Sequence, residues 1–492
     1  MASGSKLIGV CGLALGLGMA IAGGGSLTKL ALGVLMALLA LSVAPSVTRW
    51  RLPQSGFLAI EAPIVLLLVS TLVLRTRDAE ALAQNPLDTA GLFRTACVGL
   101  AVLLGIAALL AVDTSSHLRP LTTKPFRLYW PYLLVVLLGA LLSVNPGLTA
   151  YRGLELAAAL IVLAGACNVG GLSAVTRIKA LFYWFLVALL SMVWFWVIIS
   201  PGTALERVAE RSVIEAPLPV RVVGVFPVMS ANFVGTLGVI LLMWSLGRLL
   251  SLARGAEGPR PTVLWMLAGL GGLTVIAAQY RTGYVATVVG LAVLLVVRRK
   301  IGLAAAIAAV LVTAALVGFR PGSEVERFVL RGQPEQVAVS LSGRTFWWDQ
   351  ALPVWQSSPL VGKGLLTASR FEVLDVLGRT TTATIHGTWI ETLVGTGLFG
   401  TALLLGSLLI CWRRALIAGR ASGDVVPALL LAVLTVRSLT ANTIESFGLE
   451  ALLFLVIALG LRDAPPPQEL VPLVRRRSWS VNSPTKRGLF TR

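Results

Sequence analysis

The sequence predicts an all-α polytopic membrane protein with about 12 to 14 transmembrane helices and one long outer loop that carries short amphipathic helices. Two observations lead to this fold class. Of the 492 residues, 56% are hydrophobic and only 13% are charged, about half the charged share of an ordinary soluble domain. Apolar runs of about 17 to 22 residues also recur along the chain, and each is long enough to cross a bilayer.

The apolar runs, counted in order, suggest about fourteen helices. They are expected at residues 7–22, 28–45, 57–74, 95–112, 129–143, 154–169, 180–200, 231–250, 262–279, 283–297, 302–318, 388–411, 425–441 and 447–461. The first run follows Lys6 and resembles a signal peptide. No A-x-A cleavage site comes after it, so we interpret it as a retained first helix.

The basic residues predict the topology. If both termini are cytoplasmic, the basic residues of the short loops collect on the cytoplasmic side, among them Arg298, Arg299 and Lys300. The long loop, about residues 319–385, then lies outside. The net charge of +19 is therefore interpreted as a consequence of topology, and no nucleic-acid partner is expected.

This topology divides the chain into five expected regions. They are N-terminal transmembrane helices (1–128), a transmembrane core (129–318), the outer loop (319–385), C-terminal transmembrane helices (386–461) and a basic cytoplasmic tail (462–492). In the outer loop, residues 344–356 predict an amphipathic helix at the membrane interface, because Trp348 and Trp355 are seven apart and share a face. These tryptophans are either an aromatic anchor in the interface or a platform for a sugar.

Polar and ionisable residues gather at the outer ends of the predicted helices. An ionisable group at membrane depth costs several kcal/mol unless it faces a cavity or a partner, so these residues are candidates for function. The set is Arg221, Arg281, Arg344, His386, Glu391, Asn442 and Glu445. Structural roles are open for each: the first two arginines could reach the headgroups, His386 could cap the helix that begins near Gly387, and the glutamates could pair with arginines.

Other kinds of site find no support in the sequence. It has no carboxylate cluster for a divalent metal, no P-loop and no GxSxG elbow. Cys11, Cys97, Cys167 and Cys411 fall in or beside apolar runs and are interpreted as small core residues. Three outer arginines and a histidine indicate an anionic substrate bound without a metal or other cofactor, because guanidinium groups bind phosphate oxygens in pairs.

Several ordered motifs resemble the O-antigen ligase and O-antigen polymerase superfamily. The resemblance covers about residues 130–460. The early outer turn is similar at Arg152, and a second motif is similar at Arg221, Gly224 and Asn232. YRTG is similar at Arg281, the outer-loop motif is similar at Arg344, Trp348, Pro359, Gly362 and Gly364, and His386 is followed by Gly397 and Gly400. Family members usually carry Asn, Ser or Gln directly after the histidine, whereas this chain has Gly387.

The resemblance implies a glycosyltransferase of the bacterial inner membrane whose site faces the periplasm. Its donor would be a glycan on undecaprenyl diphosphate, and its acceptor a lipid, another glycan or a protein. The implied catalytic residues are His386, Arg344 and Arg281, with Arg221, Asn232, Glu391, Glu445 and Trp348 as substrate-binding residues. A ligase and a repeat-unit polymerase both fit. A transporter or flippase for a lipid-linked anion is the alternative from another class.

Overall fold

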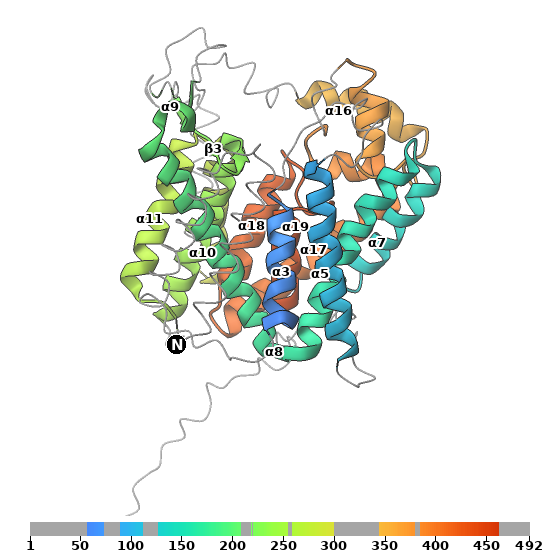
Figure 1. Cartoon of the computed structure of the whole chain (residues 1–492). Coiled ribbons are helices and arrows are strands. Elements are labelled where there is room, and N and C mark those ends of the chain that lie inside the picture. The colour runs from blue at the N-terminus through green and yellow to red at the C-terminus, as the bar shows by residue number, and fades with distance from the viewer. Residues whose placement is uncertain are drawn as a thin grey trace, which may run out of the picture.

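The computed structural model describes residues 57–72, 89–111, 126–207, 218, 220–253, 258–299, 344–378 and 384–461. These residues form an all-α bundle in which most helices run side by side (Figure 1). Four of the described helices are long and apolar enough to cross a membrane, and shorter apolar helices accompany them. The predicted polytopic all-α class is confirmed. The helices expected at 7–22, 28–45 and 302–318 and the tail at 462–492 lie outside the described residues.

The first half of the bundle is built around one long, bent helix. Its elements are α3 (Phe57–Ser70), α5 (Thr89–Leu110), α7 (Tyr129–Leu138), the 3-10 turn η1 (Gly139–Leu142) and α8 (Pro146–Ile199). The side chain of Asn145 caps α8 by accepting from the N–H of Leu148. Two helices with a loop at 170–179 were expected here. The two helices are present, but they meet directly at Gly171, whose φ of 54° is left-handed, and the residues after it are helical rather than a loop.

Two short hairpins precede the next group of helices. After α9 (Pro201–Ala204), β1 (Leu205–Arg207) pairs antiparallel with β2 (Val220–Val222), and β3 (Gly224–Val225) pairs with β4 (Val228–Met229). The bundle then continues with α10 (Ala231–Leu252), α11 (Pro261–Ala277) and α12 (Arg281–Val297). The α9–β3 segment lies at the same end of the bundle as α16, and the turn of α8 lies at the opposite end (Figure 1).

The C-terminal part begins with the predicted amphipathic helix. Its elements are α16 (Arg344–Gln356), the π-helix η3 (Ala368–Leu374), α17 (Thr388–Ala421), α18 (Val426–Ser438) and α19 (Leu449–Gly460). The bounds predicted for α16 are confirmed. Because α17 runs past the predicted end at 411, Arg413, Arg414 and Arg420 belong to this helix rather than to a loop.

Two apolar cores hold these elements together. The larger core fills the bundle, and a smaller one joins α16, η3 and the start of α17 through Ala351, Ala368, Val373, Leu374, Ile385 and Val394. Trp347 and Trp355 pack against this smaller core. These two tryptophans of α16 therefore contact protein on one side of the helix.

The loop after α16 is bound to a break in α17. Gly397 interrupts the helix with a φ of 65°, and the N–H groups of Leu398 and Phe399 donate to the carbonyls of Pro359 and Leu360 over 2.9 and 3.1 Å. In return, the N–H of Gly364 donates to the carbonyl of Gly395 over 2.9 Å. A β-carbon at Gly397 would lie 2.3 Å from the carbonyl of Leu360. The close approach of the two backbones requires glycine.

Candidate active site

The turn that carries His386 has an unusual backbone. His386 has a φ of 54° and Gly387 a φ of 137°, a conformation that only glycine adopts readily. A β-carbon at Gly387 would lie 3.3 to 3.5 Å from the indole of Trp348. The glycine that departs from the family pattern is therefore required by this backbone and by the neighbouring ring.

Side chains of α16 hold the turn from one side. Trp348 donates from Nε1 to the main-chain oxygen of His386 over 2.9 Å. The ring of Trp347 lies 5.8 Å from the imidazole, centroid to centroid. The helix that begins at Arg344 thus fixes the position of His386. The sequence had predicted Trp348 as an interface anchor or a substrate-binding residue, and not as a contact of His386.

The turn between α18 and α19 contacts the His386 turn from the other side. The N–H of Thr388 donates to the carbonyl of Ala441 over 3.1 Å, and the N–H of Gly387 donates to Oδ1 of Asn442 over 3.3 Å. The hydroxyls of Thr388 and Thr443 lie 2.9 Å apart. Asn442, predicted from its place in an outer turn, is thus in direct contact with the histidine turn.

Two arginines act electrostatically on the imidazole. Burial, and to a smaller extent the positive charges of Arg344 and Arg437, together lower the pKa of His386 to about 4. Burial also lowers the pKa of the Arg344 guanidinium. His386 is therefore neutral at physiological pH and has a nitrogen lone pair available to accept a proton.

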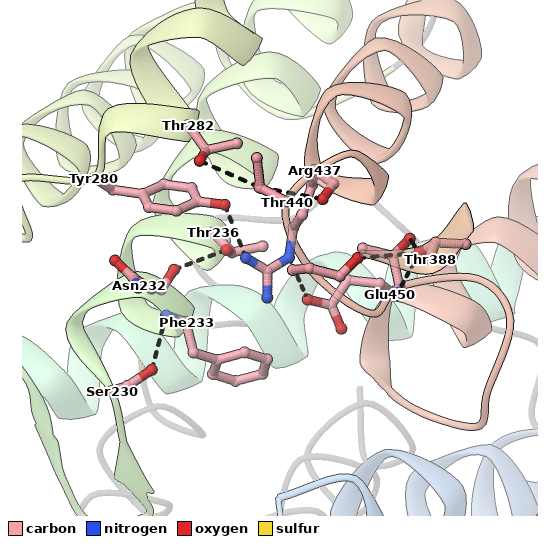
Figure 2. Close-up of polar contacts among 12 residues, drawn as sticks. Ser230, Asn232, Phe233, Thr236, Tyr280, Thr282, Thr388, Arg437, Thr440 and Glu450 are labelled. Carbon is pink, nitrogen blue, oxygen red and sulfur yellow. Dashed lines mark hydrogen bonds and ion pairs between the residues drawn. The ribbon is translucent and has the colours of Figure 1, made fainter. Parts of the chain in front are cut away.

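Arg437 was not among the residues predicted from the sequence. It lies at the end of α18, with its Nε 2.8 Å from Oε1 of Glu450 and its Nη1 2.8 Å from the hydroxyl of Tyr280 (Figure 2). The sequence did hold a signal, since Arg437 is an ionisable residue in an apolar run.

Arg281 is the first residue of α12 and follows Tyr280, which is the N-cap of that helix. The hydroxyl of Thr282 lies 3.3 Å from that of Thr440, in the turn that also contacts the histidine loop. The start of α12 therefore meets the same turn as His386. This brings the Arg281 segment to the end of the bundle where Arg344 and His386 lie.

Arg221 and Asn232 lie on neighbouring elements. Arg221 is in β2, and its Nε is 2.9 Å from Oε2 of Glu206 in β1. Gln279 joins β2 to the start of α12, because its Nε2 donates to the carbonyls of Leu218 and Val220 over 2.8 and 3.0 Å. Asn232 is in the first turn of α10 (Figure 2).

Glu391 and Glu445 are buried carboxyls that accept hydrogen bonds from hydroxyl groups and main-chain N–H groups. Glu391 accepts from the hydroxyl of Ser369 over 2.6 Å and from the N–H of Leu366. Glu445 accepts from the hydroxyl of Thr388 and the N–H of Thr443, both over 2.8 Å. Burial raises the pKa of Glu445 to about 7. Both residues connect the histidine turn to the rest of the fold.

Residues 263–405 match the model of a known family, described as O-antigen ligase. The matched region runs from α11 into α17 and includes Arg281, Arg344, Trp348, His386 and Glu391. Arg221, Asn232, Arg437 and Glu445 lie outside it. No curated protein matches the chain.

Proposed function

We propose that this membrane protein is a glycosyltransferase that moves a glycan from an undecaprenyl diphosphate carrier to an acceptor hydroxyl, in the manner of the O-antigen ligase and polymerase superfamily. The match of residues 263–405 to the O-antigen ligase model supports the proposal. The observation that carries the proposal is that α16, which begins at Arg344, holds the His386 turn through Trp348, so that the charge of Arg344 acts on a partly buried imidazole. One group accepts a proton, and the other binds the anion that leaves.

The arginines supply what the departing diphosphate requires. As the bond from the anomeric carbon to the diphosphate oxygen breaks, negative charge grows on that oxygen. Cations that are already in place and partly shielded from water stabilise this added charge in the transition state, by several kcal/mol relative to the ground state, in which the diphosphate carries less negative charge. Arg344 and Arg281 are assigned this role, and Arg221 and Asn232 contact the phosphates or the first sugar.

His386 is assigned as the base. The acceptor oxygen forms a bond to the anomeric carbon, its proton passes to the imidazole, and undecaprenyl diphosphate leaves with the electron pair of the broken bond. The imidazolium then releases its proton to solvent. A single displacement of this kind inverts the anomeric centre. No metal is assigned to the reaction, and full activity in excess chelator is the expected result; a loss restored by magnesium would contradict it.

The test is reconstitution with a short undecaprenyl diphosphate glycan, with the products analysed by mass. Release of undecaprenyl diphosphate with the glycan on an added acceptor lipid is the result expected for a ligase. A ladder of longer carrier-linked glycans without acceptor identifies a polymerase. No release by intact protein with donors of its own pathway would overturn the proposal in favour of a transporter.

Variants connect the activity to the site. Arg344→Ala and His386→Ala are expected to abolish transfer while inserting normally. Arg420→Ala is the matched control, because Arg420 is exposed and lies in the last turn of α17. Wild-type transfer by either site variant in correctly inserted protein would show that the assigned site is wrong.

A further inference from the structure

A buried polar network at the ends of three helices has no assigned part in the reaction above. It consists of Tyr280, the N-cap of α12, Arg437 in the last turn of α18, and Glu450 in the first turn of α19. The three residues retain only 3%, 9% and 6% of their surface exposed. Figure 2 shows the guanidinium of Arg437 between the tyrosine hydroxyl and the carboxylate.

Stability alone is a weak explanation for such a network. Removing two charges from water costs several kcal/mol for each ion, and the attraction between them only roughly offsets that cost. Apolar side chains of similar size would hold helix ends together at least as well. The position of the network relative to the site is therefore the more informative feature.

On one side, the network fixes the residue that precedes Arg281. The ring of Tyr280 lies between two glycines: a β-carbon at Gly235 of α10 would come 2.4 Å from its Cβ, and one at Gly283 would come 2.4 Å from its Cδ1. The absence of a side chain at both positions leaves the space that the tyrosine occupies. Its hydroxyl then accepts from Nη1 of Arg437.

On the other side, the network supports the histidine turn. The carbonyl of Arg437 accepts from the N–H of Ala441 over 2.9 Å, and the carbonyl of Ala441 accepts from the N–H of Thr388 over 3.1 Å. Two main-chain hydrogen bonds thus join the end of α18, which the Arg437 side chain ties to Tyr280 and Glu450, to the backbone beside His386. Its charge also acts on His386 and Arg344.

We propose that Arg437 is a positioning residue of the transferase site, which holds Arg281 through Tyr280 and the His386 turn through Ala441, with Glu450 as its counter-ion. The inference rests on the proposed function, because that function assigns Arg281 and His386 their roles. It adds one residue from outside the family-matched region, 263–405, on which the geometry of both depends.

The first test uses three conservative variants. Tyr280→Phe keeps the ring and removes the hydroxyl, Arg437→Lys keeps the charge, and Arg437→Gln removes it. We expect Tyr280→Phe and Arg437→Gln to lower kcat by about tenfold or more, the equivalent of one lost hydrogen bond to a charged group. Arg437→Lys should recover part of the rate. Wild-type kcat in all three would overturn the proposal.

The second test does not need activity. The chain has two histidines, so ¹³C-labelled histidine with His117→Gln leaves one signal, that of His386, to titrate by NMR. The charged groups on the elements around His386 include Arg344 and Asp349 of α16, Arg437, Glu391 and Glu445. Of these groups, the variants Tyr280→Phe, Arg437→Lys and Arg437→Gln alter only Arg437. Arg437→Gln should raise the pKa of His386 by about half a unit or more, because a like charge is removed; Arg437→Lys should not.

The two readouts separate the possible failures. If wild-type protein transfers no glycan but the His386 titration responds as expected, the proposed function fails and the structural coupling stands. If the wild type is active and folded Arg437→Gln protein titrates like the wild type, the positioning role fails. A residue that only stabilised the fold would lower the yield of monodisperse protein and leave the kcat of the folded fraction unchanged.

Discussion

Trp348 donates its indole N–H to the main-chain oxygen of His386 over 2.9 Å. This bond passes between the outer helix α16 and the turn before α17, two segments that are far apart in sequence. The donor fixes the backbone of the histidine, whose φ of 54° is left-handed. The direction of the imidazole therefore depends on a helix that also carries Arg344.

Trp348→Phe should lower the transfer rate. The substitution keeps a ring and removes one hydrogen bond, worth about 1 kcal/mol, so a decrease of several-fold is expected. Trp355→Phe is the matched control, because Nε1 of Trp355 donates to the carbonyl of Pro359 over 3.1 Å, away from His386. Equal rates for the two variants in the reconstituted assay would contradict a role for Trp348 at the histidine.

Gly387→Ala should impair the site through both space and backbone conformation. The new β-carbon would lie 3.3 Å from the indole of Trp348, and the φ of 137° is one that side chains rarely allow. Gly378→Ala provides the comparison, since Gly378 has a φ of 65° with nothing within 4 Å of its β-position. We expect a large loss of transfer only for Gly387→Ala. A fully active Gly387→Ala enzyme would show that this backbone is not needed for catalysis.

The pH dependence of the rate should differ between free and bound enzyme. In the free enzyme the pKa of His386 is about 4, so protonation of this base should lower kcat/KM only at pH values near 4. A bound diphosphate offsets the positive charges of the arginines and raises that pKa. The acid limb of kcat should therefore lie at higher pH than that of kcat/KM. Coincident limbs in the two profiles would argue against His386 as the base.

Glu445 should make the fold less stable at alkaline pH. Its pKa rises from 4.5 in the unfolded chain to about 7 in the fold, so the folded state binds the proton more tightly. Stability is then highest at low pH and falls as the pH rises from 4.5 to about 7, by on the order of 3 kcal/mol.

The substitution Glu445→Gln removes this titration. In detergent, its thermal midpoint should exceed that of the wild type at pH 8 and equal it near pH 5. Asp349→Asn removes an exposed carboxylate of α16 and should have the same thermal midpoint as the wild type at both pH values. A midpoint for Glu445→Gln that stays below the wild type at pH 8 would mean that the ionised carboxylate is needed for the fold.

Gly397→Ala should destabilise the outer loop. Its β-carbon would lie 2.3 Å from the carbonyl of Leu360 and its φ is 65°, so the loop has to separate from α17. Gly269→Ala in α11 meets nothing within 4 Å and should be neutral or slightly stabilising, because alanine favours helix. Limited proteolysis measures the difference: faster cleavage between α16 and α17 is expected for Gly397→Ala alone, and equal cleavage of both variants would refute it.

Much of the bundle was predictable, because long apolar runs mark the segments that form membrane-crossing helices. The bounds of α16 and the start of α17 agree with the sequence pattern. The loop expected at 170–179 was wrong for a local reason: one left-handed glycine reverses the chain, and the polar residues after it remain helical. Hydropathy reports burial in lipid and does not report turns.

The sequence predicted which residues form the site better than it predicted the contacts between them. The free-energy cost of an ionisable group at membrane depth identified His386 and Arg344 as candidates. In the structure, the charge of Arg344 acts on His386. The run 425–461 holds one arginine and two glutamates, but nothing in the sequence says which glutamate takes the arginine. The answer, Glu450, depends on how α18 and α19 meet. Likewise, the periodicity of the sequence does not predict that the segments of Gly397 and Leu360 come into contact.

The break in α17 also determines how far the chemistry stands from the bilayer. The part of α17 that follows the break, up to Ala421, is about 36 Å long at 1.5 Å per residue, against about 30 Å of hydrocarbon. The part before Gly397 is covered by the outer loop, so the crossing begins near the break. Thr388 then lies about 14 Å beyond it along the axis. In the proposed reaction, the carrier phosphate would have to rise above the headgroup layer to meet His386. The exposed side chains of Leu360, Val361, Leu398 and Phe399 would then offer the isoprenoid units that follow it an apolar surface outside the lipid.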